Sequence, residues 1–389
     1  MIKKMFNLRI INRLLFVSCL FISAITQAAN TIPTAPTLAA KGYVLLDFNS
    51  GQIIAEDKAD QRMEPASLTK MMSTYVISHE LKAGNISLQD KVTISKKAWR
   101  MPGSRMFVEV GKQIDVEKLL KGIIIQSGND ATVAMAEFVA GSEDAFASLM
   151  NNYAQQLGML GTHFVNSTGL PDAEHYTTPR DMAILGSALI RDFPEHYKWY
   201  AIKKFTFNNI TQYNRNKLLW RDKSVDGIKT GHTESAGFCL VSSSVRDDMR
   251  LVSVVLGTKS DSARVEESQK LLSYGFRFYR SHKLYDANTE ISTTDVWKGA
   301  KDNLSLGLLR ELYVTIPRGQ YKQLKPSINF ESIIEAPINK HQVLGSLAVK
   351  LNDKIIAERK LVALNEIEQG SLWKRLVDWF ILLIKGWFG

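Results

Sequence analysis

Short apolar runs separated by turn residues begin near residue 43, and a helical pattern follows them. The runs 43–47 and 52–55 flank Asn49-Ser50-Gly51, which is a hairpin signature. From Ser67 to about residue 81, apolar residues recur at helical spacing, with Pro65 just ahead and Gly84 just beyond. Proline near the start and glycine past the end are typical of helices. The pattern predicts a β-hairpin and then a helix that begins at Ser67.

Two more helices are predicted on either side of a tight turn. Residues 116–125 and 131–139 have helical periodicity, and Gln126-Ser127-Gly128-Asn129-Asp130 separates them. Similar segments predict helices over 143–157, 179–191 and 262–279. Apolar runs over 227–243 and 249–257 predict two antiparallel strands joined at residues 246–248. Together these elements predict an antiparallel sheet with helices packed on its faces, in an α/β (α+β) domain.

The last third of the chain has a different pattern. After Lys283, short β-type runs alternate with turns that contain proline, glycine or Asn-Asp, and they cover residues 312–316, 342–351 and 355–363. This spacing predicts a small C-terminal all-β domain. Residues 372–389 then form one apolar helical face that carries tryptophans, with most of the charges elsewhere.

A basic amphipathic helix of this kind is expected to lie in a membrane interface. The alternative is a helix that docks on the protein itself. A membrane span is disfavoured because charges interrupt the segment.

The first 29 residues have the pattern of a secretory leader. Basic residues precede an apolar run over 14–25, and the run is followed by small residues at Ala28 and Ala29. We therefore predict a signal peptide. The predicted organisation is a signal peptide over 1–29, a catalytic domain over 30–283, a β-rich domain over 284–366 and an amphipathic anchor helix over 367–389.

The charge and the cysteine content of the chain limit which binding partners and cofactors are expected. The formal net charge of +10 falls to about +6 when the four basic residues of the leader are removed. This surplus suits an anionic membrane surface or an acidic wall polymer, whereas its dispersion argues against nucleic acid. Cys239, the one cysteine outside the leader, lies in an apolar run and is predicted to be a buried core residue. No metal or other cofactor is implied, because the histidines form no H-E-x-x-H string.

Three short strings in one order carry the chemistry. They are Ser67-Leu68-Thr69-Lys70, Ser127-Gly128-Asn129 and Lys229-Thr230-Gly231. Singly they are weak, since residues 371–374 also fit S-x-x-K and residues 327–329 also fit S-x-N, although only one K-T-G occurs. Their order and their predicted positions at a helix start, in a turn and on a strand indicate an active-site serine acyltransferase.

The residues of each string are suited to one step of acyl transfer. Residues i and i+3 share a helix face, so Lys70 can reach the Ser67 hydroxyl as its base. The lysine needs burial and a neighbouring cation to lower its pKa, and Lys229 is predicted to supply that charge. Ser127 can relay a proton to the leaving group. Asn129 can bind a peptide backbone, and Lys229 with Thr230 can bind a terminal carboxylate.

The chain resembles the D-alanyl-D-alanine carboxypeptidases of the penicillin-binding protein 5/6 group. The three strings carry this resemblance, together with residues 162–170 and 226–233 and the ending Gly386-Trp387-Phe388-Gly389, and it covers nearly the whole mature chain. It implies a peripheral enzyme on the periplasmic face of the inner membrane. The implied substrates are peptidoglycan stems that end in D-Ala-D-Ala, and the implied inhibitors are β-lactam antibiotics. A homodimer is left open.

Residue by residue, the resemblance implies the following roles. Ser67 is the acylated nucleophile, Lys70 its base, Ser127 the proton relay and Lys229 the partner of the substrate carboxylate. The amides of Ser67 and His232 form the oxyanion hole. Further substrate-binding residues are Asn129, Thr230, Gly231, Arg215 and Arg264.

Three rival functions stay open at this point. A β-lactamase of the class A type needs a glutamate for deacylation, in an E-x-x-x-N string, and none occurs between Ser127 and Lys229. Transpeptidation or endopeptidase action on crosslinks would use the same acylation residues. A non-catalytic wall-binding scaffold is disfavoured because Ser67, Lys70 and Ser127 are all intact.

Overall fold

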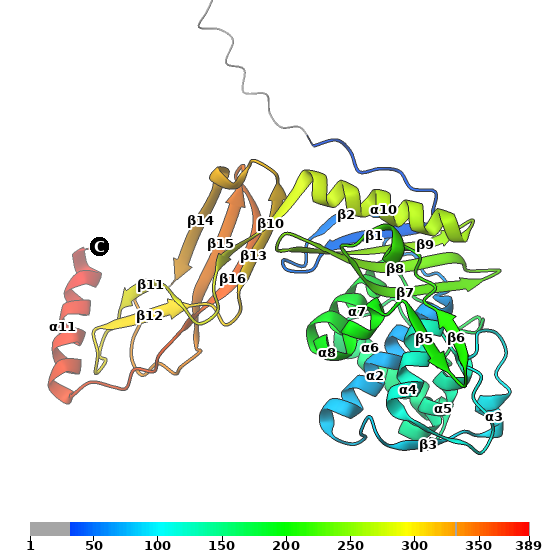
Figure 1. The fold of residues 1–389 in the computed structure, drawn as a ribbon. Coiled ribbons are helices and arrows are strands. Elements are labelled where there is room, and N and C mark those ends of the chain that lie inside the picture. Colours follow the sequence, from blue (N-terminus) through cyan, green and yellow to red (C-terminus); the bar gives the residue numbers. More distant parts are fainter. Residues whose placement is uncertain (1–31, 331–332, 389) are drawn as a thin grey trace, which may run out of the picture. The chain divides into compact units, whose positions relative to one another are not determined.

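The computed structural model of the chain describes residues 32–330 and 333–388. The predicted signal peptide over 1–29 lies outside the described residues. One hydrophobic core is built from residues between 44 and 256, and another is built from residues between 296 and 367. The fold class predicted from the sequence is correct: a mixed helix and sheet region is followed by an all-β region and a terminal helix (Figure 1).

Among the described residues, five antiparallel strands form the main sheet. Its order is β2 (Ile53–Asp57), β1 (Gly42–Asp47), β9 (Met249–Thr258), β8 (Gly237–Arg246) and β7 (Val225–Thr233). The hairpin predicted at the start of the chain is therefore confirmed as β1 and β2. The β7 strand carries Lys229-Thr230-Gly231 and lies at one edge of this sheet.

The single strand predicted over 227–243 is wrong, because the chain turns back between β7 and β8. In that turn the Ala236 amide donates to Thr233 Oγ1 at 3.0 Å, and Gly237 has a φ of 70°. A glycine adopts that left-handed conformation without steric cost. The apolar pattern did not reveal the turn because both strands are largely buried, so hydrophobic residues continue across it.

Helices cover both faces of the sheet (Figure 1). The α10 helix (Asp261–Phe278) packs against one face, and α7 (Pro179–Asp192) packs against the other. The remaining helices of this region are α2 (Thr69–Ala83), α3 (Lys96–Trp99), α4 (Val116–Lys121), α5 (Asn129–Ala140), α6 (Glu143–Leu157), α8 (Pro194–Tyr197) and α9 (Leu218–Arg221). The short strands are β3 (Lys91–Thr93), β4 (Gln113–Asp115), β5 (Lys204–Phe207) and β6 (Ile210–Tyr213).

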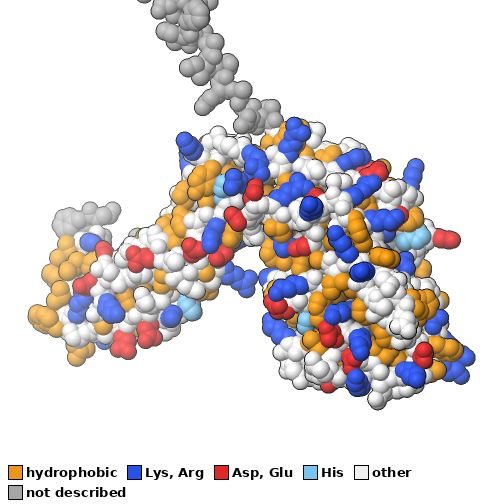
Figure 2. Space-filling view, in the orientation of Figure 1, with side chains coloured by type: hydrophobic (Ala, Val, Ile, Leu, Met, Phe, Trp, Pro, Cys, Tyr) orange, Lys and Arg blue, Asp and Glu red, His pale blue; other side chains and the backbone are white. Residues whose placement is uncertain are grey.

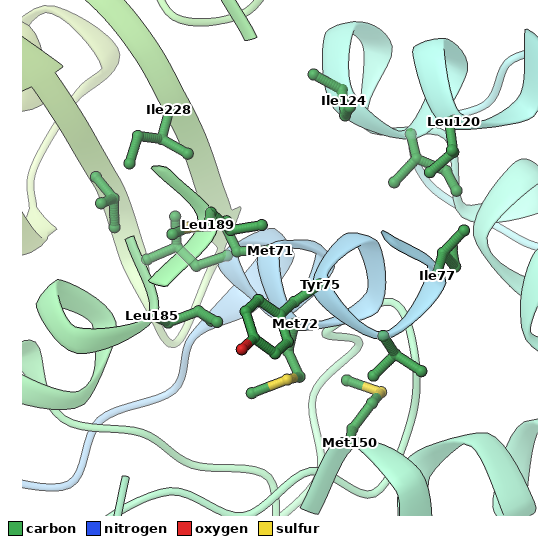
Figure 3. Close-up of a cluster of buried hydrophobic side chains, with 14 of the residues drawn as sticks. Met71, Met72, Tyr75, Ile77, Leu120, Ile124, Met150, Leu185, Leu189 and Ile228 are labelled. Carbon is green, nitrogen blue, oxygen red and sulfur yellow. The ribbon is translucent and has the colours of Figure 1, made fainter. Parts of the chain in front are cut away.

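The α2 helix lies in the middle of the larger core. Every residue from Thr69 to Ser78 is buried, so its N-terminal half is enclosed on all sides. Figure 3 shows Met71, Met72 and Ile77 of this helix facing side chains from surrounding elements, which are Leu120, Ile124, Met150, Leu185, Leu189 and Ile228. Such packing fixes the helix and therefore the direction in which its first turn points.

The C-terminal β region contains strands that the sequence did not reveal. Its strands are β10 (Tyr279–Tyr285), β11 (Glu290–Asp295), β12 (Asn303–Gly307), β13 (Leu312–Pro317), β14 (Leu324–Phe330), β15 (Val343–Leu351) and β16 (Lys354–Ala363). The β14 strand is exposed along most of its length, so it lacks a clear apolar alternation. The β10 strand crosses the predicted boundary at 283/284 and pairs with β13. The domain boundaries therefore stay predictions.

The chain ends in α11 (Leu372–Phe388), at the position predicted for an amphipathic helix. The helix carries exposed apolar side chains that include Leu372, Trp373, Leu376, Trp379 and Phe380. Figure 2 shows hydrophobic atoms gathered over this end of the described chain. Among residues 32–330 and 333–388, no helix is both long and apolar enough to cross a membrane.

Candidate active site

Ser67 lies in a tight turn, η1 (Ala66–Leu68), directly ahead of α2. The preceding residue, Ala66, has a φ of 47°, which non-glycine residues rarely adopt, and backbone strain of this kind clusters at functional sites. Lys70 lies in the first turn of α2, and its Nζ donates to Ser67 Oγ at 3.1 Å and to the Thr168 carbonyl at 2.6 Å. The predicted nucleophile and base are therefore in hydrogen-bond contact.

Lys70 is almost completely buried, and this burial lowers its pKa to about 7. The second cause is the positive charge of Arg215, whereas Asp130 and Glu143 act in the opposite direction. Arg215 is a cation that the sequence did not indicate for this role, and Lys70 and Lys229 are also coupled, since the charge of Lys70 lowers the pKa of Lys229. A lysine with this pKa is substantially neutral near pH 7 and can accept a proton.

Ser127 lines the same cavity as Ser67. A short π-helical segment, η2 (Gly122–Gln126), ends at Ser127, which has a left-handed φ of 66°. The Lys229 Nζ donates to Ser127 Oγ at 2.9 Å. The turn predicted between two helices is thus present, and it brings the second and third motifs into contact.

Lys229 is buried, and its ammonium group is directed to protein atoms. Besides Ser127 Oγ, it donates to the Thr230 carbonyl at 2.9 Å. Burial, and then the charges of Lys70, Arg215 and Arg264, hold the pKa of Lys229 well below its usual value. Its side-chain partner is the Ser127 hydroxyl, whose proton transfer it can influence.

A cavity of about 610 Å³ lies beside these groups. Members of all three motifs line it, whereas Lys70 and Lys229 are buried and reach it through the two serine hydroxyls. The lining residues are Ser67, Gly103, Ser104, Ser127, Arg215, Lys217, Thr230, Gly231, His232, Phe238, Asp261 and Arg264. The structure therefore brings together Ser67, Ser127, Thr230, Gly231, His232 and both predicted arginines.

The two arginines of the cavity wall are held differently. Arg264 is buried, and its Nη1 donates to the Gly231 carbonyl at 3.0 Å, while its Nη2 pairs with Asp261. Arg215 lies on the segment ahead of α9, and burial lowers its pKa from its usual value. Both guanidinium groups remain cationic at neutral pH and can bind a carboxylate.

Close packing between the nucleophile turn and β7 requires a glycine at position 231. A Cβ atom there would lie 2.8 Å from the Pro65 carbonyl oxygen and 3.3 Å from the Ala66 Cβ. Gly169 is even more restricted, because it has a φ of 84° and its Cβ would lie 1.8 Å from the Ala66 oxygen. The nucleophile turn is thus enclosed by β7 on one side and by the 166–170 loop on the other.

Asn129 has a more structural position than predicted. Its side-chain Nδ2 donates to the Pro102 carbonyl at 2.6 Å, and its backbone amide donates to the Ser104 carbonyl at 2.7 Å. The next residue, Asp130, accepts hydrogen bonds from the backbone amides of Met106, Phe107 and Val108. These bonds fasten the loop that contains Gly103 and Ser104 to the Ser127 turn.

Sequence reasoning missed the roles of Asp130 and Thr168. The available signal for Asp130 was an acid directly after the S-x-N string, and the structure shows that this acid is buried. Thr168 contributes only its backbone carbonyl, so no side-chain pattern could reveal it. The second matches to S-x-N and S-x-x-K, which we call decoy motifs, are far from the catalytic residues in the chain. Ser327 and Asn329 lie on β14, and Lys374 pairs with Asp302. Cys239 is fully buried, as predicted.

His232 stacks on Phe238 at the cavity wall, with ring centroids 3.9 Å apart. The contact joins β7 to β8 at the edge of the sheet, where His232 and Phe238 are register partners. Backbone groups on an edge strand are open to pairing with an extended chain. The geometry therefore fits a nucleophile, a base and a cationic wall placed along the edge strand of the sheet.

Known proteins match this chain over most of its length. A family model described as D-alanyl-D-alanine carboxypeptidase matches residues 29–260, and one described as the penicillin-binding protein 5 C-terminal domain matches residues 279–369. D-alanyl-D-alanine carboxypeptidase DacA from Escherichia coli (strain K12) is 44% identical, and the match covers 99% of both chains.

Solved structures agree with this match. Penicillin binding protein 5 from Haemophilus influenzae has 43% identity and a TM-score of 0.84, covering 87% of this chain and 100% of that chain. Penicillin-Binding Protein D2 from Listeria monocytogenes, solved in an ampicillin-bound form, has 26% identity and a TM-score of 0.58, covering 63% of this chain and 100% of that chain. On this evidence the chain belongs to the D-alanyl-D-alanine carboxypeptidase family and is a serine hydrolase of that class.

Proposed function

We propose that this chain removes the terminal D-alanine from peptidoglycan stems that end in D-Ala-D-Ala, through an acyl-enzyme on Ser67. The observation that carries the proposal is the pairing of each catalytic serine with a buried lysine: Lys70 Nζ donates to Ser67 Oγ, and Lys229 Nζ donates to Ser127 Oγ. Both serines line one cavity. The family's name supplies the substrate class.

In the acylation step, the Ser67 hydroxyl transfers its proton to neutral Lys70 while Oγ attacks the carbonyl of the penultimate D-alanine. The bond between that carbonyl carbon and the terminal D-alanine nitrogen then breaks. The leaving amine takes a proton from the Ser127 hydroxyl, and the proton held by Lys70 restores that hydroxyl. Free D-alanine departs, and the shortened stem remains as an ester on Ser67.

In the second step, water attacks the ester carbonyl. A proton of the water passes to Ser67 Oγ as the bond between that oxygen and the acyl carbon breaks, and the stem leaves as a carboxylic acid that ionises to the carboxylate. The amides of Ser67 and His232 are proposed to stabilise the oxyanion in both steps, since Ser67 precedes a helix N-terminus and His232 lies on the edge strand.

The cavity wall is proposed to select a free C-terminus. Arg215 and Arg264 supply positive charge, and Thr230 supplies a hydroxyl on the same wall. Lys229 contributes charge from behind this wall, since its ammonium is directed to Ser127 and Thr230. A stem that pairs with the edge of β7 would place its terminal carboxylate among these groups.

β-Lactam antibiotics are proposed to acylate the same serine. A related protein has been solved with ampicillin bound. Fast hydrolysis of the adduct by a class A mechanism would need a glutamate in an E-x-x-x-N string, which is missing between the S-x-N and K-T-G motifs. We therefore expect a long-lived penicilloyl-enzyme rather than β-lactamase turnover.

The terminal helix is proposed to hold the enzyme on an anionic membrane surface at the periplasmic face of the inner membrane. Its polar face is turned to the protein: the Asp378 carboxylate accepts from the Lys298 amide at 2.6 Å, and Lys385 lies 4.7 Å from the Trp297 ring centroid. The apolar face is left exposed, with Leu372 82% and Trp373 75% accessible. A helix docked on the protein through its apolar face would have the opposite orientation.

Export through the signal peptide over 1–29 completes this proposal. The division into a catalytic domain over 30–283, a β-rich domain over 284–366 and an anchor over 367–389 is proposed on the same basis. The homodimer stays a prediction.

The function is tested by incubating the protein with a synthetic pentapeptide that ends in D-Ala-D-Ala. We expect equimolar D-alanine and tetrapeptide from the wild type, and no product above background from Ser67→Ala. Full D-alanine release by Ser67→Ala would contradict the mechanism. Ser371→Ala is the matched control, because it removes the serine of the decoy S-x-x-K string and should leave the rate unchanged.

A further inference from the structure

Three side chains form a continuous connection across one wall of the cavity. Lys217 Nζ lies 2.6 Å from Asp261 Oδ2, and the other oxygen of Asp261 pairs with Arg264. Arg264 in turn donates to the carbonyl of Gly231 on β7. We call Lys217, Asp261 and Arg264 the ionic strap. It joins the segment ahead of α9 to the first residue of α10 and to the K-T-G strand.

The strap is held by fixed backbone at its ends. The buried Asn216, next to Lys217, donates to the Gly227 carbonyl at 3.0 Å, and its own Oδ1 accepts from the Leu218 amide at 3.1 Å. Asp261 is the first residue of α10, a helix capped by Ser260, whose side chain accepts from the Ala263 amide. The backbone of Lys217 and the backbone of Asp261 are therefore each held by contacts of their own, and these contacts bring the two side chains together.

The Lys217–Asp261 ion pair is not needed to bind the carboxylate of the substrate. Arg215, Lys217 and Arg264 are the cations of the cavity lining, and Asp261 is the carboxylate among them. Arg215 can match one terminal carboxylate, whereas Lys217 and Arg264 share the carboxylate of Asp261. The remaining consequence of the pair is steric. Lys217 is two residues from Arg215, which the proposed function assigns to the carboxylate of the departing D-alanine, so we expect the pair to lie on the side of the leaving group.

From this geometry we propose that the ionic strap is a specificity determinant that favours cleavage of a free terminal D-alanine over cleavage of a crosslinked stem. In a crosslink, the leaving amine belongs to the side chain of a second stem, so a longer chain must leave the cavity past the strap. Both reactions form the same ester on Ser67 and differ only in the amine that departs. The inference rests on the function proposed above.

Lys217 is the residue to change, since Asp261 also holds Arg264. The Lys217 side chain is 68% exposed, and surface ion pairs contribute little to folding, so substitution should leave the fold intact. Lys217→Ala removes the strap and opens space, Lys217→Gln removes the charge with less change in size, and Lys217→Arg can restore the pair. Lys223→Ala is the matched control, because Lys223 is an exposed lysine between α9 and β7.

The experiment measures the rate of D-alanine release from a pentapeptide and the rate of cleavage of a purified crosslinked dimer for each variant of the full chain. We expect the ratio of dimer to pentapeptide cleavage to rise about tenfold in Lys217→Ala, equivalent to about 1.4 kcal/mol. The ratio should also rise in Lys217→Gln and stay near the wild-type value in Lys217→Arg and Lys223→Ala. Labelling with a fluorescent penicillin reports that each variant keeps an intact site.

Two results overturn the proposal. One is an unchanged ratio in both Lys217→Ala and Lys217→Gln while D-alanine release continues. The other is an equal rise in Lys223→Ala, which would show that the lost charge acts without the strap. Failure of the wild type to release D-alanine is a different outcome, because it contradicts the proposed function itself.

Discussion

Two buried lysines of the active site each donate to a serine hydroxyl, and their environments lower both pKa values. For Lys70 the main cause is burial, and the second is the charge of Arg215. For Lys229 burial is again first, followed by Lys70. Two adjacent ammonium groups repel each other, so the site favours a state in which at least one lysine is neutral. A neutral Lys70 is the form that can activate Ser67.

The pH dependence of acylation tests this assignment. Because the pKa of Lys70 is about 7, the second-order rate of penicillin acylation should rise with pH and reach half its plateau near pH 7. Arg215→Gln removes a positive charge that lowers this pKa, so the midpoint should move to higher pH. A stopped-flow profile between pH 5 and 9 measures both effects, with Lys223→Ala as a control for the loss of one cation. An unshifted midpoint in Arg215→Gln would contradict the coupling.

At the scale of elements, the site depends on close contact between the η1 turn, β7 and the loop that follows α6. Gly231 allows β7 to approach the carbonyl of Pro65. His175 joins α2 to the loop, because its ring bonds Thr69 Oγ1 at 2.8 Å through Nε2 and accepts from the Val165 amide through Nδ1. These contacts hold the first turn of α2, the loop and the catalytic strand in fixed positions relative to one another.

Substitution of Gly231 should disrupt this contact. A Cβ atom at that position would lie 2.8 Å from a backbone oxygen, so β7 or the nucleophile turn must move by a few tenths of an ångström or more. We expect Gly231→Ala to reduce the acylation rate about 100-fold, since small displacements of reacting groups have effects of this size. Gly386→Ala is the control, because nothing lies within 4 Å of its added Cβ. Wild-type kinetics in Gly231→Ala would show that the contact is not needed.

His175 should make stability depend on acidity. Burial lowers its pKa to about 4, compared with an ordinary value of 6.5. The unfolded chain therefore binds more protons between these values, so the free energy of unfolding falls as pH falls from about 6.5 to about 4. The loss from this one group is at most about 3 kcal/mol.

The comparison is made by urea unfolding at pH 7.5 and pH 4.5. His175→Gln should be less stable than the wild type at pH 7.5 and should lose less stability on acidification. An equal loss in both proteins would mean that other groups cause the acid sensitivity. D-Alanine release at pH 7.5 reports that the variant still folds to an active site.

The helices and motifs that the sequence predicted correctly are those that depend on local patterns. The α2, α6 and α10 helices followed from periodicity and end signals, and the three motifs followed from their spacing. The turn between β7 and β8 was hidden because buried strands on both sides are apolar. The action of Arg215 on Lys70, the Asp130 clamp on residues 106–108 and the ionic strap depend on contacts between distant segments. Sequence spacing alone carries no information about such contacts.

At the scale of the whole molecule, the chain joins a catalytic cavity to a terminal helix whose apolar face is exposed. The helix contacts the β region through polar groups, so its tryptophans and leucines remain available for a lipid surface. An exposed face of this kind is a liability in water, and the membrane surface proposed above would cover it.

Deletion of residues 372–389 tests the anchor. We expect the shortened protein to keep its rate of D-alanine release and to lose co-sedimentation with vesicles that contain anionic lipids. The double substitution Trp373→Lys and Leu376→Lys is the control. It keeps the length of the helix and places charge on its exposed face, so it separates the loss of apolar surface from the loss of residues. Sedimentation of the deletion variant as efficient as that of the full chain would contradict the anchor.

The central claim is that Ser67 forms the acyl-enzyme, and peptide mapping of the penicillin adduct tests it most directly. The protein is incubated with penicillin at pH 7.5, quenched in acid and digested, and the mass of each serine-containing peptide is measured. We predict one penicilloyl group per chain, on the peptide that contains Ser67, and none in Ser67→Ala. An adduct on another serine, or rapid penicillin hydrolysis with no adduct at all, would contradict the account.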